Sequence, residues 1–480
     1  MNPRWPTLAL VLLTAPLFAI GEGGWVRVVY PAAAVGLGLF LEARSAPAYV
    51  GFVLWLWVLS PLVRRLSDFQ AGYQDPSVLI LTPYLVTAIC VVQMFVRPLI
   101  LRTRPLLVPP GRMVFVFVAL GTALGLPIGL SLAPSRALLE SLNWLLPPAF
   151  GWWLASSPKA RLADVERAVG RTLFDVMLVI GAYGLYQFMA LTPWDADWMR
   201  HSEMTSIGYP EPHAVRVFST MQSPGVLALF LIAPVALWLA NPTVWRVPAL
   251  CLGSAALLLS QVRAGWIAVL VTGVLVLPRL SGRARARALV LGPVTLVCVL
   301  VVTSYPEIWE VTSRRLATFT QPVADESAMS RWQGHLLALD DASDHPFGRG
   351  IGVTDARLEE YLGMRDSVVV ATLVQFGIAG AVMYAIGFCG LLVLVWGYYR
   401  QANSSEQLGL AAAGIGLLSV AIFGTTTAGP PGVLLWTIGG LAAATRMRGV
   451  ETFFVPAGLT IADVTCQPQG ARAASPGGVS

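Results

Sequence analysis

Long apolar runs separated by short polar segments extend along the chain to about residue 444. A helix that crosses a bilayer needs about 20 predominantly apolar residues, and shorter runs bounded by Pro or Gly fit the same pattern. The pattern predicts fourteen membrane helices, although several runs are short and twelve is the alternative count. The runs cover residues 7–20, 28–41, 49–63, 76–96, 113–132, 138–155, 173–191, 224–240, 244–261, 264–277, 289–304, 367–399, 408–423 and 433–444.

Composition narrows the class of protein. Hydrophobic residues make up 56% of the 480 residues and charged residues 12%, whereas soluble domains carry about 25% charged residues. The sequence therefore predicts an all-α polytopic membrane protein and excludes a soluble globular enzyme. The first apolar run is expected to be a retained helix and not a signal peptide, because no small-x-small cleavage site follows it.

Basic side chains indicate the orientation of the helices, because they accumulate on the cytoplasmic side of a membrane. The polar segments that lie inside when the N-terminus is inside are rich in arginine and cover residues 97–112, 159–171, 279–287 and 446–448. We expect a membrane domain over residues 1–448 with both termini cytoplasmic. Residues 449–480, rich in Gly, Ala, Pro and Ser, are expected to form a disordered cytoplasmic tail. Asp175 is expected to pair with Arg171, one helical turn away.

Two long outer loops, residues 192–223 and 305–366, contrast with the short connections elsewhere, and the larger is expected to be partly helical. They contain all four histidines of the chain, His201, His213, His335 and His345. With the adjoining Arg263 they hold nine arginines, Arg200, Arg216, Arg263, Arg314, Arg315, Arg331, Arg349, Arg357 and Arg365. Because a guanidinium fork matches phosphate oxygens in pairs, this outer cluster suggests a bound phosphate or diphosphate. The alternative is pairing with the acids of the loops.

Arg263 has the most unusual surroundings of these arginines. It lies between two apolar helices in the segment Ser260-Gln-Val-Arg263-Ala-Gly-Trp266, and no acidic residue is near it in the sequence. Burial of an unpaired charge at membrane depth costs several kcal/mol. We therefore expect Arg263 to have a function.

That segment resembles the S-x-x-R-(G/A)-(A/G)-W helix junction of the O-antigen ligase and polymerase superfamily, membrane enzymes that polymerise or ligate lipid-linked polysaccharides. Three further segments are similar to this family's pattern and follow its order. They are Arg216-Val-Phe-Ser-Thr-Met-Gln-Ser-Pro224, then Arg331-Trp332 with Pro346-Phe-Gly348-Arg-Gly350-Ile-Gly352, then Asp366-Ser367 with Gly377. The resemblance covers roughly residues 181–396. No single segment is specific to the family, whereas the four segments in this order are moderately specific.

Asp366 is the point at which the sequence departs from the ligase pattern. Ligases of this superfamily have there a histidine that is taken to activate the acceptor, whereas several exopolysaccharide polymerase-like members have aspartate. The departure favours a polymerase and leaves the general base open between Asp366, His335 and His345. Asp366 is also placed to act as an ordinary helix N-cap.

The resemblance implies a metal-independent glycosyltransferase, without a cofactor, whose site lies on the periplasmic face of a bacterial inner membrane. Such an enzyme transfers a glycan from undecaprenyl diphosphate to a sugar hydroxyl, and so polymerises lipid-linked oligosaccharide repeat units into a surface polysaccharide or exopolysaccharide. Arg216, Arg263 and Arg331 are expected to stabilise the diphosphate leaving group. Asp366 is expected to accept the proton of the acceptor.

Other polar residues are expected near the substrate. Four of them lie in the larger loop, Arg349, Arg365, His335 and His345. Arg64 and Arg65 are expected on a short outer loop, where they bind lipid headgroups or join the same anionic site. Asp195 and Asp197 have Asp-x-Asp spacing but stand among tryptophans, which favours stacking on a sugar or a place at the membrane interface.

Three alternative functions remain open, one of which is a structural subunit of a polysaccharide export complex. An O-antigen ligase transfers the glycan to lipid A or another acceptor. A transporter or flippase has a similar number of helices but places ionisable residues in mid-membrane, where this sequence has few. The expected partners are the lipid bilayer, the lipid-linked oligosaccharide, and flippase, chain-length or export proteins of the same pathway. Nucleic acid is not expected, because the arginines do not cluster on one soluble face.

Overall fold

The computed structural model describes residues 4–96, 111–157, 161–202, 204–303, 326–353 and 367–454. In these ranges the regular structure is helical, and one isolated bridge, between Gly208 and Val215, is the only β-type pairing. The chain is an all-α polytopic membrane protein, as its apolar pattern predicts.

A helix covers each of the predicted apolar runs. The helices that match them are α1 (Trp5–Ala19), α2 (Gly23–Arg44), α3 (Ala46–Ala71), α4 (Val78–Val91) with a π-helical turn (Val92–Val96), α6 (Arg112–Leu132), α7 (Pro134–Ser156), α8 (Leu162–Ala190), α10 (Pro224–Ala240), α11 (Val247–Leu259), α12 (Arg263–Val276), α13 (Gly282–Thr303), α17 (Val368–Arg400), α18 (Ser405–Ser419) and α19 (Gly429–Phe454). α19 thus runs past residue 448, where the predicted membrane domain ends, and into the segment predicted as a tail. Two more helices, α9 (Pro193–His201) and α15 (Glu326–Asp344), lie in the long predicted loops, so the larger loop is partly helical as expected.

Five of the described helices, α2, α3, α6, α8 and α17, are long and apolar enough by length and composition to cross a membrane. The apolar helices α1, α4, α10 and α11 are shorter. Prolines inside α1, α4 and α10 remove backbone donors from these segments. The total of twelve to fourteen crossings stays a prediction.

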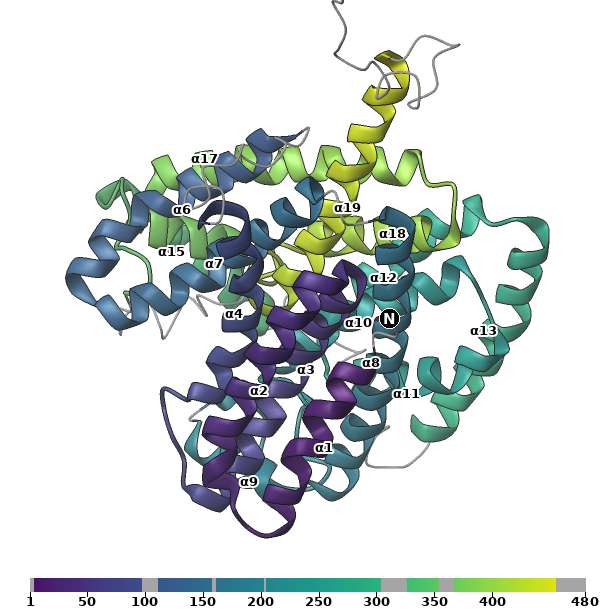
Figure 1. The fold of residues 1–480 in the computed structure, drawn as a ribbon, viewed down its shortest axis with the longest axis horizontal. Helices are drawn as coiled ribbons and strands as arrows, with labels where there is room; N and C mark the ends of the chain where they lie inside the picture. Colours follow the sequence, from purple (N-terminus) through teal and green to yellow (C-terminus); the bar gives the residue numbers. More distant parts are fainter. Residues whose placement is uncertain are drawn as a thin grey trace, which may run out of the picture.

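The helices are arranged as one bundle (Figure 1). α17 runs alongside α6, and α15 packs against α17. α2 and α3 stand side by side with α9 at one end of α3. Helices far apart in sequence are therefore neighbours, which brings parts of the two long loops to the same bundle.

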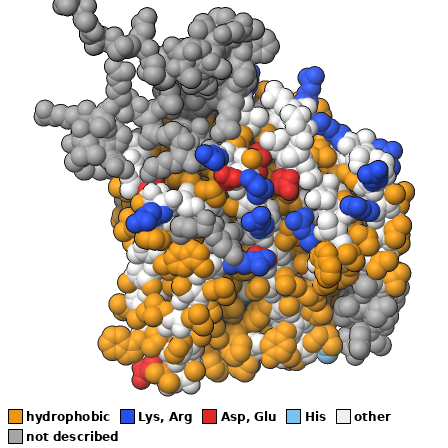
Figure 2. All heavy atoms as spheres, turned by 45° about the vertical axis from the view of Figure 1, so that its right-hand side comes forward, with side chains coloured by type: hydrophobic (Ala, Val, Ile, Leu, Met, Phe, Trp, Pro, Cys, Tyr) orange, Lys and Arg blue, Asp and Glu red, His pale blue; other side chains and the backbone are white. Residues whose placement is uncertain are grey.

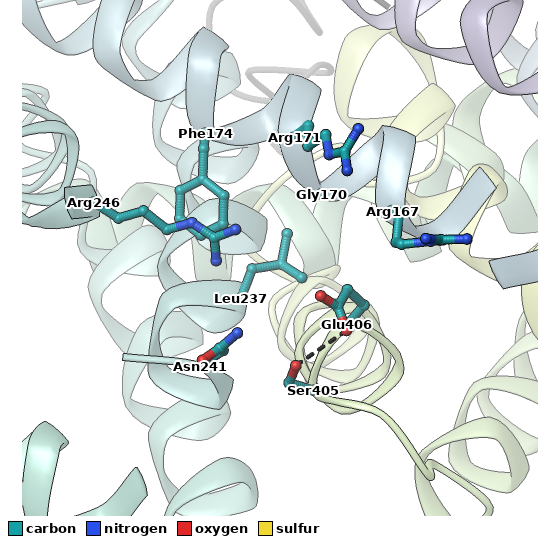
Figure 3. A pocket seen from close by; sticks show the side chains of 9 residues that line it. All are labelled: Arg167, Gly170, Arg171, Phe174, Leu237, Asn241, Arg246, Ser405 and Glu406. Atoms are coloured by element: carbon teal, nitrogen blue, oxygen red, sulfur yellow. Dashed lines mark hydrogen bonds between the residues drawn. The ribbon is translucent and has the colours of Figure 1, made fainter. Parts of the chain in front are cut away.

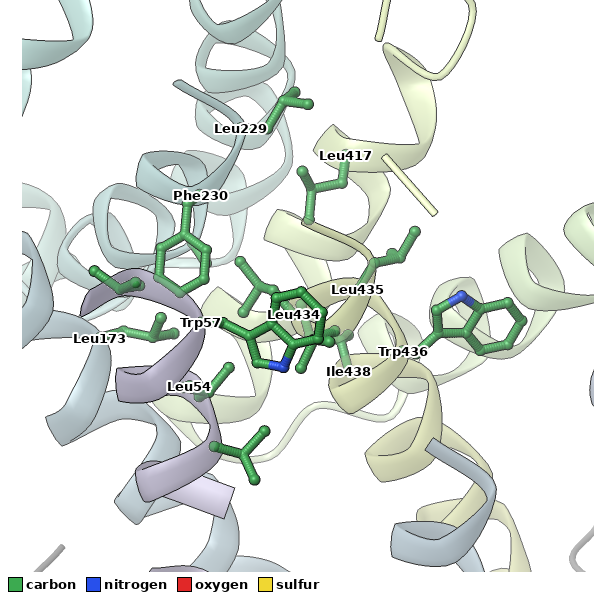
Figure 4. Close-up of a cluster of buried hydrophobic side chains, with 14 of the residues drawn as sticks. Leu54, Trp57, Leu173, Leu229, Phe230, Leu417, Leu434, Leu435, Trp436 and Ile438 are labelled. Atoms are coloured by element: carbon green, nitrogen blue, oxygen red, sulfur yellow. The ribbon is translucent and has the colours of Figure 1, made fainter. Parts of the chain in front are cut away.

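The centre of the bundle is apolar on all sides. α10 packs against α12, α18 and α19, and most of its residues are buried. Figure 4 shows side chains of α3, α8, α10, α18 and α19 meeting in one cluster that includes Trp57, Phe230 and Leu434. A helix that is hydrophobic all round is a buried helix, so α10 forms the core against which the others pack.

The outside of the bundle is apolar as well. Leu270 and Val274 of α12, and Leu289 and Val290 of α13, are exposed. Figure 2 shows a broad apolar surface with basic side chains gathered above it. Soluble monomers do not expose apolar surface of this extent, and a charged band beside it is typical of a membrane protein.

The polar connections gather at two ends of the bundle. At one end Arg27 of α2 pairs with Asp68 of α3 at 3.0 Å. At the other end the guanidinium of Arg246 lies 3.9 Å from the centre of the Phe174 ring. Each contact joins segments that the predicted orientation assigns to the same side of the membrane. Which end faces the exterior stays a prediction.

Asp175 pairs with Arg4 and not with Arg171, so the expected local ion pair is wrong. Arg4 Nε lies 2.6 Å from Asp175 Oδ2, and Arg4 Nη2 lies 2.7 Å from Asp175 Oδ1. The fold brings the start of α1 against α8, and a two-bond fork is stronger than a contact along one helix face. Arg171 makes no ion pair or hydrogen bond within the described ranges.

Candidate functional site

The junction between α11 and α12 holds Arg263. α11 ends at Leu259, and α12 begins at Arg263 itself. Gln261 turns the chain between them with a φ of 58°, a left-handed conformation that residues other than glycine seldom adopt. The buried Ser260 hydroxyl donates to the carbonyl oxygen of Leu257 at 2.6 Å. Arg263 is half-buried there, so its expected place at a helix junction is confirmed.

Arg216 lies against the same junction. Its Nε donates to the carbonyl oxygen of Ser260 at 3.3 Å, and its Nη1 donates to that of Ser206 at 2.9 Å. The next residue, Val217, donates its backbone N–H to Leu259 at 3.1 Å. Two arginines that are 47 positions apart in the sequence are thus brought to one turn of the chain. This juxtaposition is the main feature of the candidate site.

A buried glutamine fixes the loop that carries Arg216. Gln187 Oε1 accepts hydrogen bonds from the backbone N–H groups of Phe218 at 3.1 Å and Ser219 at 2.8 Å. Its Nε2 donates to Asp195 Oδ2 at 2.7 Å. Tyr183 donates its hydroxyl to the same carboxylate oxygen at 2.9 Å. A buried polar network with these bonds made holds a loop in one conformation.

Asp195 is therefore part of the protein's own framework. Its side chain is fully buried and forms an ion pair with Arg65, at 3.0 Å between Nε and Oδ1. The expectation that Asp195 stacks on a sugar or lies at the interface is wrong, because the network of α3 and α8 encloses it. Sequence reasoning missed Gln187 and Tyr183, although their spacing of four residues on an apolar helix places both on one face.

Arg64 and Arg65 lie within α3 and not on a loop, so their expected position is wrong. The helix continues to Ala71 because segments distant in sequence cover its polar last turns. Arg65 is 1% exposed and donates to the carbonyl oxygens of Met221 at 2.8 Å and Ser219 at 2.5 Å. Its position inside the protein is incompatible with binding lipid headgroups.

Arg64 has partners on its own helix and in the turn that follows. Its Nε lies 3.1 Å from Asp68 Oδ2, and its Nη2 donates to the carbonyl oxygen of Gln74 at 2.8 Å. The guanidinium also lies 5.2 Å from the centre of the Tyr73 ring. The side chain is 7% exposed, so Arg64 stabilises the end of α3.

The start of α17 forms a second group of candidate residues. His335 of α15 places Nε2 3.2 Å from the hydroxyl oxygen of Ser367. Ser367 is the N-cap of α17, and its hydroxyl accepts a hydrogen bond from Val370 N at 3.4 Å. The interpretation of Asp366 as the N-cap is therefore wrong. Asp366 and Arg365 lie outside the described residues, and so does the side chain of Arg331 on α15.

His345 and Arg349 both contact Asp341, at the other end of α15. His345 Nδ1 lies 3.4 Å from Asp341 Oδ1, and Arg349 Nη2 lies 2.6 Å from the same oxygen. The pairing with loop acids, given above as the alternative to substrate binding, thus applies to Arg349. His335 and His345 are separated by ten positions, or about 15 Å along a helix. His335, and not His345, contacts Ser367, the residue that follows Asp366.

The glycine-rich segment packs against two helices. Gly377 interrupts α17 with a φ of 68°, and a side chain on Gly348 would meet the backbone there. Arg349 N donates to Val374 O at 2.8 Å, and Ile351 N donates to Gly125 O at 3.0 Å. The glycines serve close backbone contact, because a side chain on Gly348, Gly350 or Gly352 would meet the backbone of a neighbouring segment.

Both groups of residues lie at the same end of the bundle. α12 begins beside the first turns of α10, where Gly265 faces Ala228. The segment after α18 reaches the same part of α10 through Gly424. There Ala421 O accepts a hydrogen bond from Val368 N, in the first turn of α17, at 3.0 Å. A continuous set of contacts therefore leads from the Arg216 and Arg263 junction to the start of α17.

The comparisons with known proteins bear on this same region. Residues 248–385 match the model of a family described as O-antigen ligase. The range begins at the start of α11 and ends within α17, so it includes Arg263, His335 and the glycine-rich segment, whereas Arg216 precedes it. A search of curated proteins gives no match. The match to the O-antigen ligase family over residues 248–385 confirms the resemblance of this part of the chain to the O-antigen ligase and polymerase superfamily.

Proposed function

We propose that this protein polymerises oligosaccharide repeat units carried on undecaprenyl diphosphate, at the periplasmic face of a bacterial inner membrane. The observation that carries this proposal is the juxtaposition of Arg216 with the junction that begins at Ser260 and ends at Arg263. Arg263 lies in the O-antigen ligase domain, whose relatives are glycosyltransferase-like ligases and polymerases.

The two arginines suit the chemistry of the leaving group. When a sugar leaves undecaprenyl diphosphate, negative charge grows on the diphosphate oxygens. Guanidinium groups held in place before the reaction stabilise that charge without reorganising, and they retain their own charge at any physiological pH. Arg331 joins them in the proposal because its position in α15 is near the start of α17. The charge is balanced by side chains, so the proposed reaction is metal-independent.

Asp366 is the proposed proton acceptor. The acceptor sugar hydroxyl loses its proton as its oxygen attacks the anomeric carbon of the donor and the bond to diphosphate breaks. Asp366 immediately precedes Ser367, whose hydroxyl oxygen is 3.2 Å from His335 Nε2. His335 is the alternative base. If Asp366 is the base, the imidazole of His335 is proposed to contact the acceptor sugar. Arg365 and His345 remain proposed substrate contacts outside this centre. We assign Arg64, Arg65 and Arg349 a structural role, since Arg349 pairs with Asp341.

Transfer by a ligase is the second candidate function, since the matched family is described as O-antigen ligase. The acceptor then is lipid A or another molecule instead of a second repeat unit. Both candidates use the same leaving group, so both require the arginine pair. They differ in the glycan that accumulates when the protein is missing.

Lipid-linked oligosaccharides from a deletion strain test the proposal. Single repeat units on undecaprenyl diphosphate should accumulate if the protein is a polymerase, and long unattached lipid-linked polymer if it is a ligase. A transporter predicts that the repeat units stay in the cytoplasmic leaflet. Complementation with Arg263→Ala should fail, whereas Arg287→Ala, which removes an exposed arginine of the 279–287 segment, should restore the polymer. Normal polymer from Arg263→Ala would contradict the proposal.

A further inference from the structure

A second polar site lies at the opposite end of the bundle from Arg216 and Arg263. A pocket of about 160 Å³ opens there between α8, the connection from α10 to α11, and the start of α18. Figure 3 shows Arg171 and Arg246 on one side of it and Ser405 and Glu406 on the other. None of these residues belongs to the proposed glycosyltransferase site.

The pocket carries an excess of positive charge. Arg171 makes no ion pair or hydrogen bond within the described ranges, because Asp175 pairs with Arg4. Arg246 contacts the ring of Phe174, at 3.9 Å from its centre, and likewise makes no ion pair with a described residue. Glu406, the acid of the lining, accepts a hydrogen bond from the Ser405 hydroxyl at 3.0 Å, and its negative charge also acts on Arg246. The two arginines together still leave the pocket with a net positive charge.

The third arginine of the pocket is already paired. Arg167 Nη2 lies 2.5 Å from Asp164 Oδ1, and Arg167 Nε donates to the carbonyl oxygen of Ala163 at 3.1 Å. Arg171 and Arg246 are therefore the two guanidinium groups that can bind an anion in the pocket. A phosphate group, with several oxygens in a compact arrangement, matches two such forks.

The neighbours of Arg246 indicate where the pocket lies relative to the bilayer. Trp245, the preceding residue in a short helical turn (Val244–Arg246), is 91% exposed. Exposed tryptophans on membrane proteins concentrate at the level of the lipid headgroups. Phe174 and Leu237 form an apolar part of the lining. An anion that also carries hydrocarbon chains fits this combination of charge, depth and apolar wall.

We infer that this pocket binds the phosphate of an anionic lipid headgroup, in the leaflet opposite the candidate glycosyltransferase site. Basic pockets between membrane helices are suited to such headgroups. The phosphodiester oxygens contact Arg171 and Arg246, and Asn241 and Ser405 can hydrogen-bond the glycerol hydroxyls of a phosphatidylglycerol headgroup. The bound lipid bridges α8, the α10 to α11 connection and α18, and so stabilises their packing.

Binding is measured on the purified full chain in neutral detergent, without any glycan substrate. Phosphatidylglycerol should raise the thermal unfolding temperature in a saturable way, whereas phosphatidylcholine with the same acyl chains should not. The double variant Arg171→Gln/Arg246→Gln should bind phosphatidylglycerol at least about tenfold more weakly. The matched control Arg283→Gln/Arg287→Gln removes the same charge from exposed positions outside the pocket, and it should bind like the wild type.

Three results would overturn this inference. Equal affinity of both double variants for phosphatidylglycerol would exclude the pocket as the site. Inorganic phosphate that stabilises the wild type as well as the lipid does would show that the ligand is a free ion and not a headgroup. If the double variant fails to insert, Arg171→Gln alone is used, because its side chain is exposed and has no partner among the described residues. Unchanged lipid binding by this single variant would also reject the site.

Discussion

Arg216 and Arg263 have the same charge but are positioned in different ways. Arg216 is held through its guanidinium, which donates to the carbonyl oxygens of Ser206 and Ser260. Arg263 is the first residue of α12 and is half-buried there. A substitution that keeps the charge of Arg263 but removes its guanidinium fork therefore tests what the fork contributes.

Replacement of Arg263 by lysine tests the fork separately from the charge. Arg263→Lys keeps one positive charge but loses paired contacts with two oxygens. If about 1.5 to 3 kcal/mol of charge-assisted bonding is lost, activity should fall on the order of ten- to a hundredfold. Polymer formation from lipid-linked repeat units by the purified variant measures this. A rate near that of the wild type would leave Arg263 only a general electrostatic role.

Asp366→Asn tests the proton acceptor. The amide is nearly isosteric with the carboxylate but is not a base, so transfer should slow by roughly a hundredfold or more. Because Ser367 is the N-cap of α17, this substitution leaves the cap in place. Ser367→Ala is the matched control, which should cost about 1 kcal/mol of stability and much less activity. If the Asn variant elongates glycans at the wild-type rate, His335 becomes the base to test by His335→Gln.

At the scale of elements, the end of α3 and the loop after Arg216 depend on one another. Arg65 of α3 binds Asp195 of α9 and two carbonyl oxygens of the loop, and Gln187 of α8 binds both Asp195 and the loop backbone. Three helices and a loop therefore share one buried polar network. The position of Arg216 follows from that network.

Loss of one partner from this buried pair should destabilise the protein. Arg65→Met leaves the Asp195 charge buried without its cation, which costs about 3 to 5 kcal/mol. The double variant Arg65→Met/Asp195→Asn should recover part of that loss, because no charge remains and the amide oxygen can still accept from Tyr183 and Gln187. Arg4→Gln breaks a pair whose arginine is 58% exposed, and it should cost about 0 to 1 kcal/mol. Denaturation of the purified chain in detergent distinguishes the three, and an equal loss for Arg65→Met and Arg4→Gln would refute the proposed role.

The break in α17 depends on a single glycine. Gly377 has a φ of 68°, and a side chain there would meet the backbone of Gly348. Gly377→Ala should therefore lower stability by more than about 2 kcal/mol. Gly397 lies in the same helix with no heavy atom close to its added side chain, so Gly397→Ala should be neutral or raise stability by up to about 1 kcal/mol. Similar unfolding temperatures for both variants would show that the break carries no strain of this kind.

The apolar pattern predicted helices well because a run of apolar residues is a local property. The pattern predicted the position of Arg64 and Arg65 poorly, because it ends the helix where the apolar residues end. In the structure, residues that lie 130 to 156 positions later cover the polar turns that follow. The predicted pairing of Asp175 with Arg171 is wrong for the same reason, because the actual partner, Arg4, is distant in the sequence. The position of Arg263 at a helix junction could be predicted, because the sequence itself shows a lone charge between two apolar runs. Gln187 could not be interpreted without knowing which loop lies beside it.

At the scale of the whole molecule, the connections separate into two ends with different chemistry. One end holds the Arg216 and Arg263 junction and the start of α17, and the other holds the pocket with Arg171 and Arg246. The orientation predicted from the basic residues also assigns Arg216 and Arg263 to one side of the membrane and Arg171 and Arg246 to the other. The grouping is independent of which end faces the exterior.

Labelling with an impermeant thiol reagent determines that orientation. In a background without native cysteines, Ser343→Cys should react from outside in intact cells, and Arg283→Cys should react only after the membrane is opened. Both positions are exposed, so access to the reagent depends on the side of the membrane. The reverse labelling pattern would place the proposed glycosyltransferase site in the cytoplasm and exclude the periplasmic reaction.

Arg65 and Asp195 can form their buried pair only after both α3 and α9 have been synthesised. Asp195 is synthesised 130 residues after Arg65, which at about 5 to 20 residues per second takes roughly 7 to 26 seconds. During that interval α3 is already made, but its cation has no counter-ion from α9. The last turns of α3 therefore reach their final surroundings only after α9 has been made, well after α3 itself is complete.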